Sequence, residues 1–307
     1  KKFKMEFQKA IQPLLQNEVF IFSSEHGKKG VTDSNLVRLK NQITKADDVK
    51  VKSNYNIWTG KGSIADVDLD GAEVRELADV FLNPTGVEFG RSKHKGRSHR
   101  LYKVLDLDKK KHTRKAFTFR DNPDDTTIIE LRAHNHYTMC SGSYDDGDTA
   151  IFNKSEKPAE ITWDQLLKQV AMTGVAAVML RKARTSEPHN LFYKYMAGAF
   201  KQHKLEFDDA EKIYDAVLAH HGHCNRSERL AQLKSVYKSE STQLTGLPTM
   251  VKEWKWAANE KDDLKKLLYA ITGRHALPAW TNTFVERICY MMKQKKYYDL
   301  EDKEMYD

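Results

Sequence analysis

The chain has 307 residues, of which 40% are hydrophobic and 31% charged, with seven prolines and three scattered cysteines that form no CxxC pair. This composition excludes a disordered or collagen-like chain and a disulfide framework, and the length favours one larger domain plus a smaller module. The longest apolar run, residues 174–180, is far too short to cross a bilayer, and polar residues interrupt the N-terminal apolar stretch. We therefore expect no membrane partner, no signal peptide and a cytoplasmic location.

Positive charge is concentrated in one part of the sequence. Residues 91–120 contain twelve Lys and Arg against two Asp, a net charge of +10, whereas the whole chain has +8. A local excess of this size is typical of a surface that binds a polyanion such as nucleic acid. A solvated basic face without a partner would give the same pattern.

The first half of the sequence alternates patterns typical of helices and strands. We expect helices at residues 4–16, 33–44 and 72–82, and strands at residues 18–22, 54–58, 64–70, 87–89, 98–104 and 126–132. A turn at residues 60–62 separates two of the strands, and Asn83 and Pro84 end the third helix. This alternation predicts an α+β (mixed α/β) sheet domain, which we place at residues 1–152.

The remaining sequence is dominated by helical patterns. Polar residues and a proline at 153–160 indicate a domain boundary. Helices are expected at residues 162–183, 191–204, 207–221, 227–239 and 250–258. We therefore predict an all-helical domain at residues 153–256, entered by a linker helix from about residue 161, and a partly helical extension at residues 257–307.

Three acids, Asp66, Asp68 and Asp70, occur at alternate positions near the end of one expected strand. Residues two apart in a strand share a face, so these carboxylates line one surface while Val67 points into the core. Aspartate is a poor strand residue and adjacent like charges repel, so a divalent cation held by two of the acids is the simplest resolution. The spacing leaves the choice of pair open, and the acids would equally cap the helix that begins near Gly71.

A further acid lies on another expected strand, residues 127–132. The apolar residues on either side of it take the core face, so Glu130 points away from the core together with Arg132. If the two strands are neighbours, Glu130 converges with Asp68 and Asp70. Two metal ions held by three carboxylates form the apparatus of in-line phosphoryl transfer, and Mg²⁺ or Mn²⁺ would be the ions.

The basic segment between these acids is suited to a triphosphate. Serine and histidine side chains can hydrogen-bond phosphate oxygens, and arginines add charge. The nucleotide-binding residues that we predict are Arg91, Arg97, Ser98, His99 and Arg100. The predicted contacts to nucleic-acid phosphates are Lys93, Lys95, Lys103, Lys109, Lys110, Lys111, Arg114 and Lys115.

The order of these segments resembles the archaeo-eukaryotic primase superfamily, and more narrowly the bifunctional primase-polymerases of plasmids, phages and integrated elements. Three motifs carry the resemblance: Val67-Asp-Leu-Asp70, Phe89-Gly-Arg91 with Ser98-His-Arg-Leu-Tyr102, and Ile129-Glu-Leu-Arg132. The resemblance spans roughly residues 50–256 and implies metal-binding roles for Asp68, Asp70 and Glu130 in preference to Asp66. It also implies a catalytic, phosphate-binding role for His99.

The same resemblance implies a primase-polymerase catalytic domain with an RNA-recognition-like palm sheet, followed by a helical domain that helps to hold a template or the initiating nucleotide. The implied activity is that of a template-directed nucleotidyltransferase, a DNA primase, a DNA polymerase or both, in the replication of a phage, plasmid or mobile element. The implied partners are a single-stranded DNA template with its primer, dNTP or NTP substrates with Mg²⁺ or Mn²⁺, and a helicase, either separate or continuing the same chain.

Other functions stay open on the residues alone. His134-Asn-His136-Tyr137 is similar to the paired histidines and the tyrosine of a replication-initiation endonuclease, although that enzyme would leave Asp68 and Asp70 without a role. A non-enzymatic nucleic-acid-binding or origin-binding module would explain the positive charge but not the acids. The histidines and cysteine at 220–224 are typical of a helix end, because no second pair of ligands lies at zinc spacing.

Overall fold

The computed structural model describes residues 2–25, 41–50, 53–108, 111–120, 127–186, 189–222, 225–240, 245–253, 256–273, 297–298 and 305–306. The chain divides into two compact units, Lys1–Thr272 and Gly273–Asp307. In the second unit, β12 (Tyr297–Tyr298) pairs antiparallel with β13 (Met305–Tyr306). The helix expected at residues 33–44 lies mostly outside the described residues.

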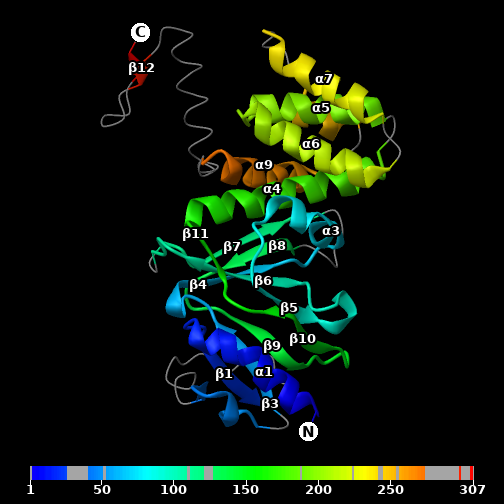
Figure 1. Ribbon diagram of the computed structural model, residues 1–307. Helices are drawn as coiled ribbons and strands as arrows, with labels where there is room; N and C mark the ends of the chain where they lie inside the picture. The colour runs from blue at the N-terminus through cyan, green and yellow to red at the C-terminus, as the bar shows by residue number, and fades with distance from the viewer. Residues whose placement is uncertain are drawn as a thin grey trace. The chain divides into compact units, whose positions relative to one another are not determined.

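Within the described ranges, the larger unit is built on an 11-stranded sheet in the order β2-β1-β3-β9-β10-β5-β6-β4-β8-β7, with β11 beside β6 (Figure 1). The strands are β1 (Ile21–Glu25), β2 (Gln42–Ile43), β3 (Ser53–Trp58), β4 (Ile64–Asp68), β5 (Val87–Arg91), β6 (His99–Val104), β7 (Arg114–Thr118), β8 (Thr127–Arg132), β9 (Tyr137–Ser143), β10 (Thr149–Ser155) and β11 (Ala159–Ile161). The pairing of β11 with β6 is parallel, and the other pairings are antiparallel. The predicted α+β class is confirmed.

Helices cover one face of the part of the sheet that contains β4, β6 and β8 (Figure 1). On α3 (Ala72–Phe81), the buried side chains Val74, Leu77, Ala78 and Phe81 recur on one helical face. The next helix, α4 (Trp163–Ala183), begins with a capping box between Thr162 and Gln165. Among the described helices, none is long and apolar enough to cross a membrane.

The helices that follow α4 in the sequence pack beyond it (Figure 1). They are α5 (His189–Gln202), α6 (Phe207–His221), α7 (Arg226–Lys238), α8 (Leu247–Glu253) and α9 (Ala258–Ile271). The middle of α4 is buried on nearly all sides because β8 and α3 lie against it on one side and α6 and α9 on the other. The long apolar stretch in α4 is therefore the centre of the unit.

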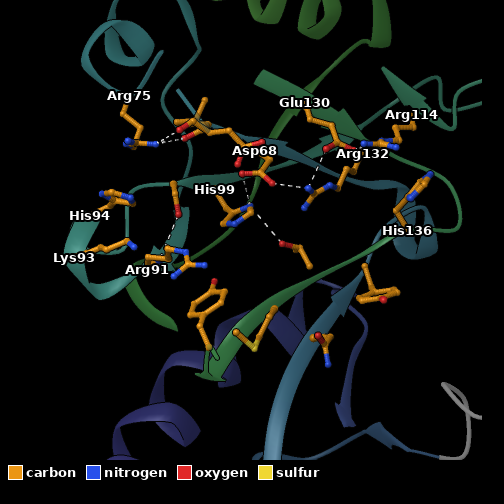
Figure 2. Close-up of a pocket in the computed structure, with 18 of the residues that line it drawn as sticks. Asp68, Arg75, Arg91, Lys93, His94, His99, Arg114, Glu130, Arg132 and His136 are labelled. Atoms are coloured by element: carbon orange, nitrogen blue, oxygen red, sulfur yellow. Dashed lines mark hydrogen bonds and ion pairs between the residues drawn. The ribbon is translucent and has the colours of Figure 1, made fainter. Parts of the chain in front are cut away.

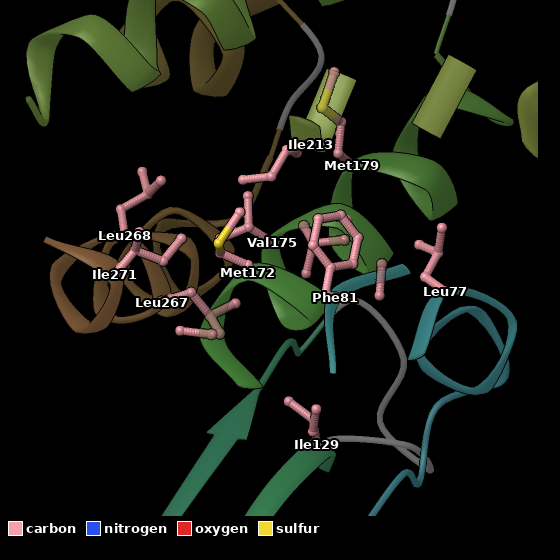
Figure 3. Packing of buried hydrophobic residues seen from close by; sticks show 14 of the residues in the cluster. Leu77, Phe81, Ile129, Met172, Val175, Met179, Ile213, Leu267, Leu268 and Ile271 are labelled. Carbon is pink, nitrogen blue, oxygen red and sulfur yellow. The ribbon is translucent and has the colours of Figure 1, made fainter. Parts of the chain in front are cut away.

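One hydrophobic core runs from the sheet into the helices (Figure 3). Ile129 on β8, Val175 on α4 and Leu267 on α9 belong to the same cluster of buried side chains. At Gly174 the elements come so close that an added Cβ would stand 2.6 Å from Leu267 Cδ2 and 3.3 Å from Ile129 Cγ2. The α9 helix, which lies in the expected extension at residues 257–307, is thus part of this core.

The sheet continues through the boundary expected at residues 153–160. There β10 extends to Ser155, and β11 pairs with β6 immediately before α4. Several side chains of β10 are exposed, so its sequence has the polarity of a linker although its backbone pairs with β5 and β9.

The opposite face of the sheet has a second, smaller core. Here α1 (Lys2–Gln16) packs Phe7, Ile11 and Leu14 against side chains from several strands. Because strand residues alternate in direction, Ile64 joins this second core while Val67 of the same strand joins the first. The acids of β4 therefore lie on the face of the second core, beyond its apolar part.

We expect Leu267→Ala to lower the free energy of unfolding by about 3 kcal/mol, because it removes a fully buried side chain from the contact between α9 and α4. Urea denaturation of the 307-residue chain measures the change. Leu105→Ala is the matched control, since Leu105 is 61% exposed, and we expect less than about 0.5 kcal/mol there. Equal effects of the two substitutions would show that α9 does not contribute to the core.

Candidate metal centre

Three carboxylates from two neighbouring strands and one loop meet at the edge of the second core (Figure 2). Asp68 ends β4 and pairs directly with Glu130 on β8, while Asp70 follows in the loop that leads to α3. One oxygen atom of each acid lies within 4.8 Å of one oxygen atom of the others. Asp68, Asp70 and Glu130 thus converge, as expected if their strands are neighbours.

The backbone around Asp70 is held in place from both sides. The N–H of Leu69 donates to Ser98 O at 2.8 Å, and the N–H of Gly71 donates to Ile128 O at 2.9 Å. From α3, Arg75 Nη1 donates to Leu69 O at 2.7 Å and to Asp70 O at 2.5 Å. The loop that carries the third acid is therefore fixed although Asp70 itself is exposed.

Two arginines neutralise part of this negative charge. Arg132 Nη2 lies 2.6 Å from Asp68 Oδ2 and 3.0 Å from Glu130 Oε2. The Nε of Arg114 donates to the other oxygen of Glu130. These hydrogen bonds outweigh the effect of burial and hold the pKa of Glu130 below its usual value.

Asp66 and Phe89 hold the ring of His99. The Nδ1 of His99 lies 3.1 Å from Asp66 Oδ2 and 3.6 Å from Asp68 Oδ1, and a carboxylate only accepts, so Nδ1 carries the donated hydrogen. The ring of Phe89 stacks on the imidazole with centroids 4.9 Å apart and planes 9° apart. Burial alone would lower the pKa of His99, but Asp68 and Asp66 outweigh it and raise the pKa to about 9.

The pKa values of Asp68, at the end of β4, and of Asp70, two residues further on, are both raised. Burial raises the pKa of Asp68, although His99 and Arg132 oppose the rise. Loss of hydration and the charge of Asp68 raise the pKa of Asp70 to about 7. Three carboxylates within reach of one another are a donor set that fits a hard divalent ion such as Mg²⁺ or Mn²⁺.

The acids open into a polar cavity of about 1040 Å³. It is lined by β3, β4, β6, β8, β9 and the segments between them, and cations face the acids across it (Figure 2). The predicted site residues that line this cavity are Asp68, Asp70, Arg91, Lys93, Ser98, His99, Arg114 and Glu130. Its volume is comparable with the upper end of the range for small-molecule and cofactor sites.

Arg97 and Arg100 do not line this cavity, contrary to the sequence-based expectation. Arg100 follows His99 in β6, so its side chain lies on the opposite face, where it is 2% exposed and donates to Asp79 on α3. Arg97 Nη2 also donates to Asp79, at 2.5 Å. Both arginines attach α3 to the sheet, and their contact with a nucleotide stays a prediction.

The predicted phosphate-binding lysines are dispersed. Lys93 reaches the cavity, and Lys95, Lys111 and Lys115 are exposed. On β6, Lys103 Nζ lies 3.9 Å from Glu18 Oε2. The remaining two predicted lysines, Lys109 and Lys110, lie outside the described residues.

Several residues around the site were not predicted as part of it. Arg75, Arg132 and Tyr144 line the cavity, and the Tyr144 ring packs on the Arg91 guanidinium at 3.8 Å. The shared face of Glu130 and Arg132 was the available sequence signal for Arg132, and the alternation of acids was the signal for Asp66. Arg75 and Tyr144 reach the cavity only through tertiary folding.

The histidines of the endonuclease alternative are not among the side chains that could share a metal ion in the part of the chain that the structure describes. There, the three carboxylates are the group of His, Cys, Asp and Glu side chains close enough to share an ion. His136 and Tyr137 line the cavity beside them but are not in that group, and neither is His134.

We expect the stability of the metal-free protein to fall between pH 6.5 and 9. The pKa of His99 is raised from 6.5 to about 9, so its charge stabilises the fold fully below pH 6.5, and this contribution is lost as the pH rises toward 9. Urea denaturation in EDTA at several pH values should give a smaller fall for His99→Gln than for the wild type. His220→Gln, on α6 and outside the cavity, should keep the wild-type slope; a wild-type slope in His99→Gln would contradict the assignment.

No protein-family model matches the chain, and no curated protein matches it in sequence. The roles of Asp68, Asp70, Glu130 and His99 are therefore argued from their geometry and from the motif resemblance.

Proposed function

We propose that this protein is a template-directed nucleotidyltransferase, a DNA primase, DNA polymerase or both, that extends a nucleic-acid 3′ end from nucleoside triphosphates with Mg²⁺ or Mn²⁺. The observation that carries the proposal is the meeting of Asp68, Asp70 and Glu130 at the wall of a polar cavity that several arginines and Lys93 also line. Phosphoryl transfer needs both parts, acids to hold metal and cations to hold phosphates.

In this proposal, one wall of the cavity binds the metal ions and the opposite wall binds the phosphates. Two divalent ions held by Asp68, Asp70 and Glu130 would supply activation of the attacking hydroxyl and charge for the triphosphate. Arg91 and Lys93, on the opposite wall, bind phosphate oxygens. Arg91 is already oriented for this by the ring of Tyr144 and by Asp146 Oδ2 at 2.7 Å.

His99 is a fixed cationic hydrogen-bond donor between these walls. Its Nδ1 is occupied by Asp66, and its ring cannot tilt freely because Phe89 stacks on it. Its pKa of about 9 keeps it charged at neutral pH, which suits contact with a triphosphate. Asp66 thus acts through His99 as a positioning residue, whereas Asp68 faces the metal.

A binding module without catalysis is a weaker explanation of this cavity. A protein that only binds nucleic-acid phosphates gains nothing from three carboxylates in the same cavity, because they repel the phosphates and cost free energy to bury. Template contacts are better assigned to the exposed cations outside it, Lys95, Lys111 and Lys115. Base identity would then be set by pairing with the template.

We expect Asp68→Asn and Asp70→Asn each to reduce primer extension by about a thousandfold, because a metal contributes several kcal/mol to transition-state stabilisation. The measurement is extension of a labelled primer on a single-stranded template with dNTP or NTP and Mg²⁺ or Mn²⁺, together with primer synthesis on unprimed template. Asp208→Asn, an exposed acid at the start of α6, is the matched control and should retain activity. Full activity of Asp70→Asn would refute the metal assignment, and an inactive wild type that binds DNA tightly would favour the binding module.

Binding of single-stranded DNA should weaken steeply with salt, by roughly 0.7 units of log K per unit of log salt concentration for each phosphate contact. Replacing Lys111 and Lys115 together by alanine should therefore lower the slope by about 1.4. Fluorescence anisotropy over a salt series measures it. The same double replacement of Lys4 and Lys9 on α1 is the control, and an equal change in both variants would contradict the assigned contact surface.

A further inference from the structure

Arg132 contacts two of the acids that would hold a metal ion (Figure 2). Its Nη2 lies 2.6 Å from Asp68 Oδ2 and 3.0 Å from Glu130 Oε2, and its Nη1 lies 3.8 Å from Asp66 Oδ2. Asp68 and Glu130 are two of the three acids of the candidate metal centre. One guanidinium therefore compensates the charge of two of these three acids.

The sheet register fixes this position. Asp68 pairs with Glu130, and Asp66 pairs with Arg132, across β4 and β8. Because alternate residues of a strand share a face, Arg132 lies beside Glu130 and opposite Asp66, with acids on two sides. The strand pairing by itself therefore places the side chain of residue 132 beside these acids.

Arg132 competes with a metal ion for Asp68 and Glu130. It cannot release these acids by losing a proton, because a guanidinium stays charged in proteins. It can release them if its side chain moves. The Arg132 side chain is 22% exposed and lines the cavity, whereas those of Asp68 and Glu130 are 7% and 3% exposed. The arginine is thus the partner with room to leave, and phosphates in the cavity would offer it a bidentate contact of equal quality.

We propose that Arg132 is an internal counterion that neutralises Asp68 and Glu130 in the metal-free protein and moves to the phosphates of a nucleoside triphosphate when metal and nucleotide bind. This inference rests on the proposed function. With metal alone, Arg132 has no bound anion to move to, so metal binding is weak. With nucleotide present Arg132 has a new partner, so metal and nucleotide increase each other's affinity by the same factor.

Mn²⁺ binding without nucleotide tests the first half of this inference. Electron paramagnetic resonance counts free Mn²⁺, and we expect Arg132→Met to bind Mn²⁺ about tenfold more tightly than the wild type, the equivalent of one charged hydrogen bond no longer displaced. Arg91→Met is the matched control, because it removes the same charge from the same cavity without touching the acids, and it should change the affinity much less.

Mn²⁺ binding with a dNTP tests the second half. The dNTP should tighten Mn²⁺ binding in the wild type, and it should do so by a factor about ten times smaller in Arg132→Met. The melting temperature of Arg132→Met should be lowered without metal, because the acids then repel one another. Saturating Mn²⁺ should restore it, because the bound ion neutralises the acids in place of the arginine.

The outcomes separate this inference from the proposed function. If folded Arg132→Met binds Mn²⁺ no more tightly than the wild type while Asp68→Asn loses Mn²⁺ binding, the counterion role is overturned and the metal centre stands. If Asp68→Asn binds Mn²⁺ as the wild type does, the metal centre and the proposed function fail together. Should Arg132→Met not fold, Arg132→Gln decides, because glutamine removes the positive charge and keeps a polar side chain that can donate a hydrogen bond; unchanged affinity there overturns the inference.

Discussion

Repulsion among buried acids is the constraint on which the rest of this structure depends. Asp66, Asp68 and Glu130 lie on adjacent strands, and each is at most 5% exposed. Carboxylates this close cannot all be ionised in a poorly hydrated place unless cations compensate them. The guanidinium groups of Arg132 and Arg114 and the imidazole of His99 are the cations in contact with these acids. Next to them, loss of hydration and the charge of Asp68 raise the pKa of Asp70 to about 7. A divalent ion held by these acids would relieve the same repulsion that costs stability.

The two faces of the sheet differ in composition: one packs against helices, and the other also carries the polar cavity. One face joins the helices in a core centred on α4, and Arg97 and Arg100, which do not line the cavity, attach α3 to this side of the sheet. The other face is apolar only where α1 covers it. Where α1 no longer covers this face, the polar residues of β4, β6 and β8 begin. The cavity therefore lies at the border of the second core, and the strands that line it are packed by both cores.

The parts of the fold and site that depend on local alternation could be predicted from the sequence. The acids of β4, the orientation of Glu130 and most helices followed from patterns a few residues long. The partners of these residues could not be predicted, because they come from contacts such as that of Arg97 with Asp79, 18 positions apart, or of Arg114 with Glu130, 16 apart. The strand β7 was missed because three of its five residues are exposed, and the polar end of β10 falls in the boundary predicted at residues 153–160.

The direct pairing of Asp68 with Glu130 has a consequence for folding fidelity. A shift of β8 by one residue against β4 would turn Glu130 and Arg132 into the hydrocarbon side of the sheet and Ile129 and Leu131 into the cavity. Such a slipped chain would bury an ion pair among apolar side chains and expose two large aliphatic groups to water. Misaligned intermediates are therefore penalised on both faces at once, and any molecule that completes its core has also assembled its acidic site in the correct register.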